Sequence, residues 1–363
     1  MAKHCPANER VKRDYFLYLK EAKACSDASV DSVAATIARF EQCNGHKDFK
    51  RFHKLQAVKF KEYLAAQKNA ATGKPLSLAT QGAMLHTLKI FFVWLAAQPG
   101  FKSRFTYADA HYFSQSDKDS RAAQTHTARP FPSLEQAQRV IRSMPAASVI
   151  EQRDRALMAF ILLTGCRDRA AVSLNLQHID LAAKLVWLDA RNVTMKNSKT
   201  VTTYFMPVGD DIRAMFCAWI GTLKDDHQWG PCDPLFPATL MLHDPEHGFR
   251  AGGIKREHWT TANAVRRIFS DAFKHAGLPA FHPHSFRHTL AHLGMQICTT
   301  PEAVKAWSQN LGHEHVMTTF NSYGNVALDR QGEIIGGLGN PTQREADDLM
   351  RGFADFIKGK VKG

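Results

Sequence analysis

Apolar residues in the first hundred positions of the chain recur at helical spacing. Side chains three and four positions apart share one face of a helix, so each stretch with this spacing predicts an amphipathic helix. The stretches are residues 11–19, 30–40, 55–63 and 78–95. Ser77 is a favoured N-terminal cap for the last of them, and Pro99-Gly100 marks its end. We therefore expect a bundle of four helices over residues 1–112.

Residues 113–132 break this pattern, and a second helical region follows them. The stretch is polar, rich in Ser and Asp, and ends in two prolines, which is the composition of an exposed linker. After it, Ser133 is placed to cap a helix, and the apolar run RDRALMAFILLTG predicts a buried helix that ends at Gly165. We place the domain boundary in this linker and assign residues 133–330 to the second domain.

The hydrophobic period changes after Gly165. Residues 184–188 and 200–208 are rich in β-branched and aromatic side chains, which predicts a β-hairpin or a small sheet. Helical patterns return over 261–277, 285–296 and 301–312. The predicted fold class is mainly α, with a four-helix N-terminal bundle and a mostly helical second domain that holds one small antiparallel β-sheet.

The charge of the chain points to a polyanionic partner. The formal net charge is +13 and the pI about 9.4, and Lys and Arg are spread along the whole chain. Positive side chains that neutralise phosphates release counterions and so favour binding to nucleic acid. A basic surface without any ligand is the alternative that charge alone leaves open.

Cysteine usage and the N-terminus bear on the compartment. The seven cysteines include no CxxC pair, which argues against a disulfide framework and against a structural zinc site. The first residues lack an apolar signal segment, and the run IFFVWLAA is far shorter than the roughly 20 residues of a membrane span. We expect a cytoplasmic protein with no membrane partner.

Two segments of the second domain carry histidines at helix ends. In HPHSFRHT, His284 and Arg287 lie on one face of a first helical turn, where the helix dipole already favours anions. In PEAVKAWSQNLGH, Gly312 is the expected helix stop and His313 lies just outside it. Tyr323 follows ten positions after His313 on a short predicted helix. Packing roles remain the alternative for each of these residues.

Two further positions add positive charge. Arg167 follows the glycine that ends an apolar helix, where a guanidinium needs an anionic partner or must point to solvent. Arg153 and Arg169 are the arginines that we expect at the surface. Lys196 and Lys199 lie in the turn of the predicted hairpin, and a solvated turn lysine is the alternative for either of them.

The order of these residues resembles that of the tyrosine recombinase family, also called the phage integrase family, of site-specific DNA recombinases. The residues that carry the resemblance are Arg167, a hairpin lysine, His284, Arg287, the LGH of 311–313 and Tyr323. The resemblance covers about 130–330. The N-terminal bundle is similar to that family's core-binding domain in general character only.

The resemblance implies that Arg167 and Arg287 clamp the scissile phosphate and that Lys196, favoured over Lys199, protonates the leaving 5′ oxygen. Two guanidinium groups can neutralise the charge that builds on the non-bridging oxygens of a phosphodiester under attack. Such a site needs no metal and no other cofactor. A divalent cation does the same work in many nucleases.

The resemblance further implies that Tyr323 is the nucleophile and that His284 and His313 share proton transfer and hydrogen bonding. A tyrosine with an ordinary pKa near 10 needs cationic neighbours and a base to react at neutral pH. A covalent 3′-phosphotyrosine would conserve the bond energy, so rejoining would need no ATP. The implied partner is double-stranded DNA, bound by a homo-oligomer, expected to be a tetramer, on paired sites, and no small-molecule substrate is expected.

The sequence departs from the family pattern at three places, one of which is the pair Lys196 and Lys199, since the run KNSK offers two candidates for the hairpin lysine. The family usually has an acidic residue three positions after the first arginine, where this chain has Ala170, and Asp168 is the candidate substitute for supporting Arg167. The interval from His313 to Tyr323 is ten, whereas nine is common in the family.

Two other features leave alternatives open. His284, His288 and His292 have helical spacing, but no HExxH or further carboxylate accompanies them, so we expect His288 in the core and His292 at the surface. In the tail over 331–363, an apolar stripe predicts an amphipathic helix that docks on another protomer or on its own domain. The stripe is Ala346, Leu349, Met350, Phe353, Phe356 and Ile357.

The expected function is a recombinase or integrase of a bacterial mobile element. A type IB topoisomerase-like enzyme would use the same chemistry to relax DNA without pairing two sites. A DNA-binding protein without catalytic activity would use the same basic surface, and a metal-dependent hydrolase would lose activity with a chelator. Neither the target sequence nor the direction of the reaction follows from the residues.

Overall fold

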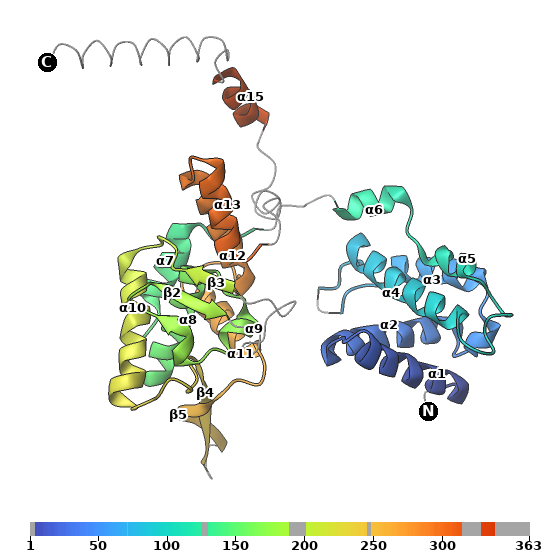
Figure 1. Cartoon of the computed structure of the whole chain (residues 1–363), viewed down its shortest axis with the longest axis horizontal. Coiled ribbons are helices and arrows are strands. Elements are labelled where there is room, and N and C mark those ends of the chain that lie inside the picture. Colours follow the sequence, from blue (N-terminus) through green and yellow to red (C-terminus); the bar gives the residue numbers. More distant parts are fainter. Residues whose placement is uncertain are drawn as a thin grey trace, which may run out of the picture. The chain divides into compact units, whose positions relative to one another are not determined.

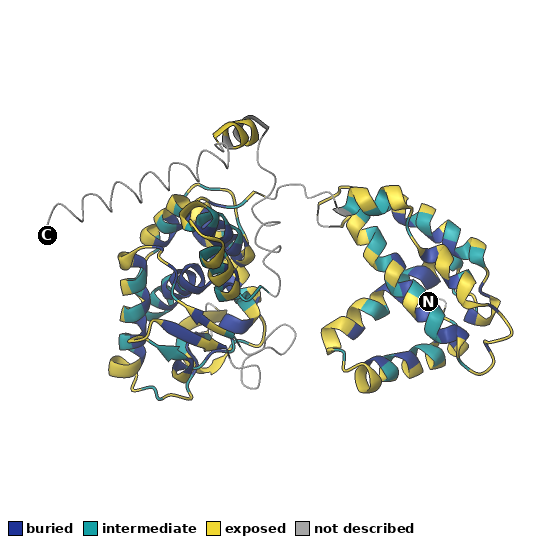
Figure 2. Ribbon diagram, turned by 45° about the horizontal axis from the view of Figure 1, so that its top comes forward, coloured by how far each residue is buried: buried dark blue, intermediate teal, exposed yellow. Residues whose placement is uncertain are grey.

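The computed structural model describes residues 4–70, 72–124, 130–188, 201–244, 248–313 and 328–337. It divides into two units, Met1–Thr127 and Ala128–Gly363. Figure 1 shows both units, and Figure 2 shows that within each of them the buried residues face inward. The fold is mainly α, as predicted.

The first unit is a helical bundle. Its helices are α1 (Pro6–Leu17), continued by the π-helical turn η1 (Tyr18–Ala22), α2 (Asp27–Asn44), α3 (Lys54–Ala66), α4 (Leu78–Ala96), α5 (Tyr107–Ala110) and α6 (Asp117–Gln124), with the 3₁₀ turns η2 (Phe49–Arg51) and η3 (His111–Phe113). The four predicted helices correspond to α1 through α4. Ser77 caps α4 by accepting from the Thr80 N–H, and Gly45 ends α2 in the left-handed conformation.

Aromatic side chains fill the core of this unit. Phe40, Phe60 and Phe92 are fully buried. The Phe40 ring meets each of the other two edge to face, at 5.4 Å between centroids. Among the described residues, α4 is long and apolar enough by length and composition to cross a membrane. Its Leu88 and Leu95 are fully buried in the aromatic core of the bundle, which accounts for the apolar character of the helix.

The predicted linker over 113–132 was too long. Phe113 is fully buried in the first unit, and α6 packs against α4 within the range. Ser116 caps α6, since its hydroxyl accepts from the Asp119 N–H at 3.1 Å, a local signal that the polar composition conceals. At the other end, Pro132 accepts a hydrogen bond from the Thr289 hydroxyl at 2.6 Å.

The second unit surrounds one central helix, α8. Its helices are α7 (Leu134–Ser143), α8 (Val149–Thr164), α9 (Asp168–Ala171), α10 (Asp210–Gly221), α11 (Asn263–His275), α12 (Pro283–Ile297), α13 (Pro301–Asn310) and α15 (Leu328–Gly337), with η4 (Leu176–His178) and η6 (Thr222–Asp226). Every residue of α8 from Ala156 to Thr164 is buried, so this helix has no solvent face over its second half.

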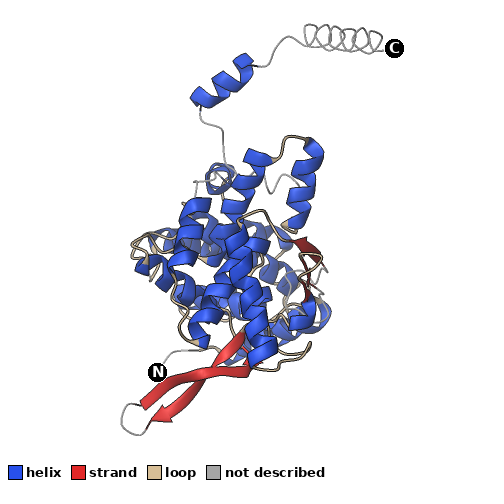
Figure 3. Cartoon of the chain, turned by 90° about the vertical axis from the view of Figure 1, so that its left-hand side faces the viewer, coloured by secondary structure: helices blue, strands red, loops and turns tan. Residues whose placement is uncertain are grey.

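Two antiparallel sheets belong to this unit, whereas one was predicted. The predicted hairpin is confirmed by β1 (Ile179–Asp180), β2 (Leu185–Leu188) and β3 (Val201–Tyr204), ordered β1-β2-β3. The second sheet pairs β4 (Pro237–Asp244) with β5 (Gly248–His258) in a ribbon that extends from the helices (Figure 3). Glycines and charged residues in β5 hide its strand pattern in the sequence.

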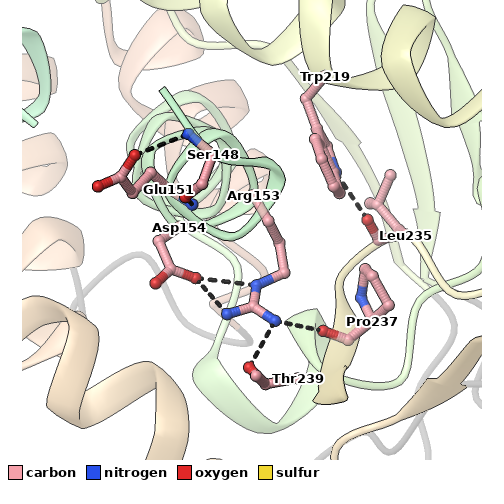
Figure 4. A network of polar contacts seen from close by, with 8 residues as sticks. All are labelled: Ser148, Glu151, Arg153, Asp154, Trp219, Leu235, Pro237 and Thr239. Atoms are coloured by element: carbon pink, nitrogen blue, oxygen red, sulfur yellow. Dashed lines mark hydrogen bonds and ion pairs between the residues drawn. The ribbon is translucent and has the colours of Figure 1, made fainter. Parts of the chain in front are cut away.

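Arg153 fastens this ribbon to α8 and is not the surface residue that was expected. Its side chain is 3% exposed and donates to Asp154 at 2.7 and 2.9 Å, and to the Pro237 carbonyl and the Thr239 hydroxyl at 3.0 Å each (Figure 4). The guanidinium also lies 4.6 Å from the centroid of the Trp259 ring. Apart from Asp154, the partners come from distant parts of the chain, so the sequence around Arg153 does not reveal its burial.

We expect Arg153→Met to lower the free energy of unfolding of the second unit by about 3 kcal/mol, since it removes one partner from a buried ion pair. Burial already raises the pKa of Asp154 against the opposing effect of Arg153, so protonation of that carboxyl limits the loss. Urea denaturation followed by tryptophan fluorescence measures the change.

The matched control is Arg142→Met. Arg142 pairs with Asp211 at 2.6 Å, but the two side chains are 50% and 44% exposed. Screening by solvent keeps the expected loss well below that of Arg153→Met. Equal effects of the two substitutions would show that the Arg153 network does not stabilise the unit.

Candidate active site

Arg287 connects the C-terminal ends of two helices. It lies in the first turns of α12 and is 5% exposed. Its Nη1 donates to the Gly165 carbonyl, at the end of α8, and its Nη2 donates to the Leu311 carbonyl, at the end of α13, each at 2.5 Å. The buried Nε has no hydrogen-bond partner. Two hydrogen bonds thus fix the guanidinium, and the N–H of its Nε is buried in the site without a partner.

Gly165 makes this close approach possible. It ends α8 with φ +62°, and its N–H donates to the Ile161 carbonyl at 2.9 Å. A Cβ at this position would lie 2.8 Å from Leu311 Cδ2 and 3.2 Å from Leu290 Cδ1. A side chain here would therefore meet both the left-handed backbone and the packing of the two helices that carry the site.

The end of α13 aims His313 at the same region. Gly312, with φ +67°, donates to the Gln309 carbonyl at 2.7 Å, and the His313 N–H donates to the Ser308 carbonyl at 3.1 Å. These two bonds form a Schellman motif, as the predicted stop at Gly312 requires. Burial, together with the positive charges of Arg287 and Arg167, lowers the pKa of the His313 imidazole to about 4.

His284 occupies the first turn of α12. The helix begins at Pro283, and the Ser285 hydroxyl donates to the His282 carbonyl at 2.7 Å. His284 as a whole residue is exposed, yet desolvation of its ring and the charge of Arg287 lower its pKa to about 4. Both histidines are therefore neutral at pH 7 in the DNA-free protein, and each can accept a proton.

Arg167 is half-buried at the N-terminus of α9. Within the described ranges no residue accepts a hydrogen bond from its guanidinium. The predicted support from Asp168 is wrong, because Asp168 Oδ2 accepts from Arg266 Nε at 2.9 Å. Arg266 lies on α11, and this pairing across the unit could not be inferred from local spacing.

Positive charge is concentrated where these side chains meet. Burial lowers the pKa of Arg287 to about 10, with Arg167 adding to the shift, so the group stays charged at neutral pH. Burial also raises the pKa of the neighbouring Cys166 thiol to about 12, so it supplies no counter-charge. In the part of the chain that the structure describes, no carboxylate pairs with Arg287. A bound phosphate would compensate this buried cation.

Strand β3, which follows the predicted lysine turn in the sequence, lies beside this cluster. Lys196 and Lys199, between β2 and β3 in the sequence, lie outside the described residues, and so does Tyr323. Val201, the first residue of β3, is next to Gly312, because a Cβ on that glycine would lie 3.7 Å from Val201 Cγ1. The predicted C-terminal amphipathic helix also lies outside the described residues.

The remaining histidines of α12 pack against an aromatic ring. His288 and His292 are both half-buried, with their rings 6.1 and 5.7 Å from that of Phe131, and His288 also contacts the His284 ring at 5.3 Å. His288 is thus less buried, and His292 more buried, than expected. Over the described residues, no three His, Cys, Asp or Glu side chains are grouped as metal ligands.

We expect the DNA-free protein to lose stability as the pH falls from 6.5 to 4. The pKa values of His284 and His313 drop from an ordinary 6.5 to about 4 on folding, so the unfolded chain binds more protons across this window. Stability rises with pH wherever the unfolded state binds more protons, so this contribution is complete above pH 6.5. Urea denaturation at several pH values measures the slope of the unfolding free energy against pH.

In the double variant His284→Gln, His313→Gln this slope should be shallower. An unchanged slope would contradict the lowered pKa values of the two histidines.

Comparisons with known proteins agree with this arrangement. The family model described as "Phage integrase family" matches residues 133–330. A curated relative, tyrosine recombinase XerC 2 of Ralstonia nicotianae (strain ATCC BAA-1114 / GMI1000), is 26% identical over 148 residues, which are 41% of this chain and 37% of that protein. The match therefore spans little more than a third of the relative's length.

Solved structures share the fold at low sequence identity. A dimer of a lambda integrase fragment bound to a COC′ core site has a TM-score of 0.58 and 13% identity, over 88% of this chain and 99% of that chain. The Tn1549 transposon integrase in complex with transposon right end DNA has a TM-score of 0.57 and 15% identity, over 90% and 99%. With its family match covering more than half of its length, the chain belongs to the phage integrase family.

Proposed function

We propose that this protein is a site-specific DNA recombinase that cleaves and rejoins DNA through a 3′-phosphotyrosine intermediate. The observation that carries the proposal is the buried guanidinium of Arg287, held by the ends of α8 and α13 with Nε unpartnered and flanked by Arg167, His284 and His313. These cationic and neutral donors suit the binding of one anion. A phosphodiester under attack is such an anion, and negative charge develops on its non-bridging oxygens during the reaction.

Each step of the proposed reaction conserves atoms and protons. The Tyr323 oxygen attacks the phosphorus, its proton passes to a neutral imidazole, and the bond from phosphorus to the 5′ oxygen breaks. Lys196 donates a proton to that oxygen, which leaves as a 5′ hydroxyl. Arg167 and Arg287 neutralise the non-bridging oxygens throughout. Attack by a 5′ hydroxyl of another strand reverses the sequence and rejoins DNA.

The partner in this proposal is double-stranded DNA, bound by a homo-oligomer that we expect to be a tetramer on two paired sites. The net charge of +13 suits such a partner. The related structures named above are complexes with a core site or with a transposon end. Integration or excision of a bacterial mobile element, within the cytoplasm, is the role that we infer for the reaction.

Covalent capture from a DNA pool tests the proposal without a known target. The protein is mixed with duplexes that have a randomised core and a nick just 3′ of it. After cleavage, the short strand with the 5′ hydroxyl dissociates, so rejoining is prevented and the cleaved DNA stays covalently attached to the protein. DNA recovered with denatured protein is sequenced, and the enriched sequence is placed twice on one plasmid. Recombination between the copies is expected.

Other outcomes separate the alternatives. Relaxation of plasmid without exchange between the two copies would indicate a topoisomerase. Retention of DNA only before denaturation would indicate a binding protein without catalysis. Cleavage that leaves no DNA on the protein and stops with a chelator would indicate a metal-dependent hydrolase.

A further inference from the structure

The side chain of Asn310, the last residue of α13, binds the backbone of strand β3 at both of its polar groups. Its Oδ1 accepts from the Tyr204 N–H at 2.7 Å, and its Nδ2 donates to the Tyr204 carbonyl at 2.9 Å. Its own backbone carbonyl accepts from the Thr203 hydroxyl at 3.2 Å. The other side of β3 pairs with β2, so Asn310 occupies the free edge of the sheet as another strand would.

This contact is one of two that fix β3 to the helix ends around Arg287. Just beyond the strand, the Met206 N–H donates to the Leu163 carbonyl at 2.6 Å, two residues before Gly165. The edge of the sheet is therefore tied to the end of α8 at one point and to the end of α13 at another. Arg287 joins the same two ends through Gly165 and Leu311.

Three successive residues at the end of α13, Asn310, Leu311 and Gly312, thus each make a contact that positions a different part of the site. Asn310 binds β3, the Leu311 carbonyl accepts from Arg287, and the Gly312 turn sets the direction of His313. Strand β3 follows the segment that carries Lys196. In the proposed reaction, we therefore expect the position of β3 along α13 to affect how Lys196 meets the phosphate.

We propose that Asn310 is a positioning residue for proton donation to the leaving 5′ oxygen. A general acid must lie within hydrogen-bond distance of the atom that it protonates, and an error near 1 Å can cost about 100-fold in rate. Asn310 holds β3 in place through two hydrogen bonds to one residue, a restraint against sliding that a single bond would not supply. The inference rests on the proposed function, since it concerns one step of that reaction.

A substrate with sulfur in place of the bridging 5′ oxygen separates this step from the others. A thiolate leaves without protonation, so cleavage of the sulfur substrate does not need the lysine proton. Rates of adduct formation are measured under single-turnover conditions on nicked duplexes of the captured sequence, one with oxygen and one with sulfur. A general loss of packing would slow both substrates alike.

We expect Asn310→Ala to slow cleavage of the oxygen substrate by about 10- to 100-fold and that of the sulfur substrate by no more than about threefold. Thr203→Val, which removes the second contact and keeps the side-chain shape, should show the same preference to a smaller degree. Gln309→Ala is the matched control, because Gln309 is an exposed neighbour on the same turn and should leave both rates unchanged.

The possible results are distinguishable. Equal slowing of both substrates by Asn310→Ala, or wild-type rates on both, would overturn the positioning role while leaving the proposed function intact. If Asn310→Ala fails to fold, the same comparison with Thr203→Val decides the question. Failure of the wild-type protein to form an adduct with either substrate would instead refute the proposed function.

Discussion

Replacing Tyr323 by phenylalanine is expected to abolish the covalent protein–DNA product and to leave DNA binding within about twofold of wild type. The substitution removes one phenolic oxygen and keeps the ring, so packing and charge are unchanged. Without this oxygen no bond to phosphorus forms. Adduct formation on the captured nicked duplex measures the first effect, and a binding titration on the intact duplex measures the second.

The proposed reaction requires a tyrosine to act as a nucleophile near neutral pH. Its ordinary pKa near 10 leaves little phenolate at neutral pH, so a proton acceptor and nearby positive charge are required. His284 and His313 have pKa values of about 4 and are therefore unprotonated before attack, while Arg287 remains cationic. Binding of the phosphate places a negative charge beside these rings, which favours their protonation during transfer.

Tyr204→Phe serves as the matched control. Tyr204 is 58% exposed on β3 and contacts Asn310 through its backbone, so the loss of its hydroxyl should not affect cleavage. A covalent product that persists in the Tyr323→Phe variant would show that another residue is the nucleophile. Loss of the product in the Tyr204→Phe variant would implicate a tyrosine that the family pattern does not include.

The sequence predicted the elements whose ends carry local signals. Ser77 and Ser133 are N-caps as expected, and Gly165 and Gly312 end their helices in the left-handed conformation. These residues interact with backbone groups within one turn, so their spacing along the chain is sufficient. The same signals placed Arg167, His284, Arg287 and His313 at helix ends, and the structure brings these four together in one unit.

Contacts between distant segments were missed or misjudged. Asp168 adjoins Arg167 in sequence, yet its carboxylate pairs with Arg266 from α11. Arg153 was expected at the surface, but in the structure its guanidinium is buried and donates to Pro237 and Thr239 of β4. Asn310 has no special appearance in the run SQNLGH, because its partner is the backbone of Tyr204. Each of these interactions depends on tertiary packing, which periodicity does not encode.

Replacing Arg287 by lysine is expected to slow adduct formation by about 100- to 1,000-fold, the cost of losing one preorganised donor to a developing oxyanion. Lysine presents one ammonium group, which cannot reach the Gly165 and Leu311 carbonyls together and still contact a phosphate. The positive charge is kept, so the effect isolates geometry from net charge. Single-turnover cleavage at saturating protein measures it.

The control is Arg169→Lys, which alters an exposed arginine on the neighbouring α9 and should leave the rate unchanged. A substrate in which methyl replaces one non-bridging oxygen distinguishes lost phosphate binding from misfolding. Its phosphorus centre carries no charge to neutralise, so the deficit of Arg287→Lys should shrink on it, whereas a misfolded site would remain slow on both. If Arg287→Lys cleaves the ordinary phosphodiester at a rate near that of wild type, the guanidinium held between α8 and α13 does not stabilise the phosphate during transfer.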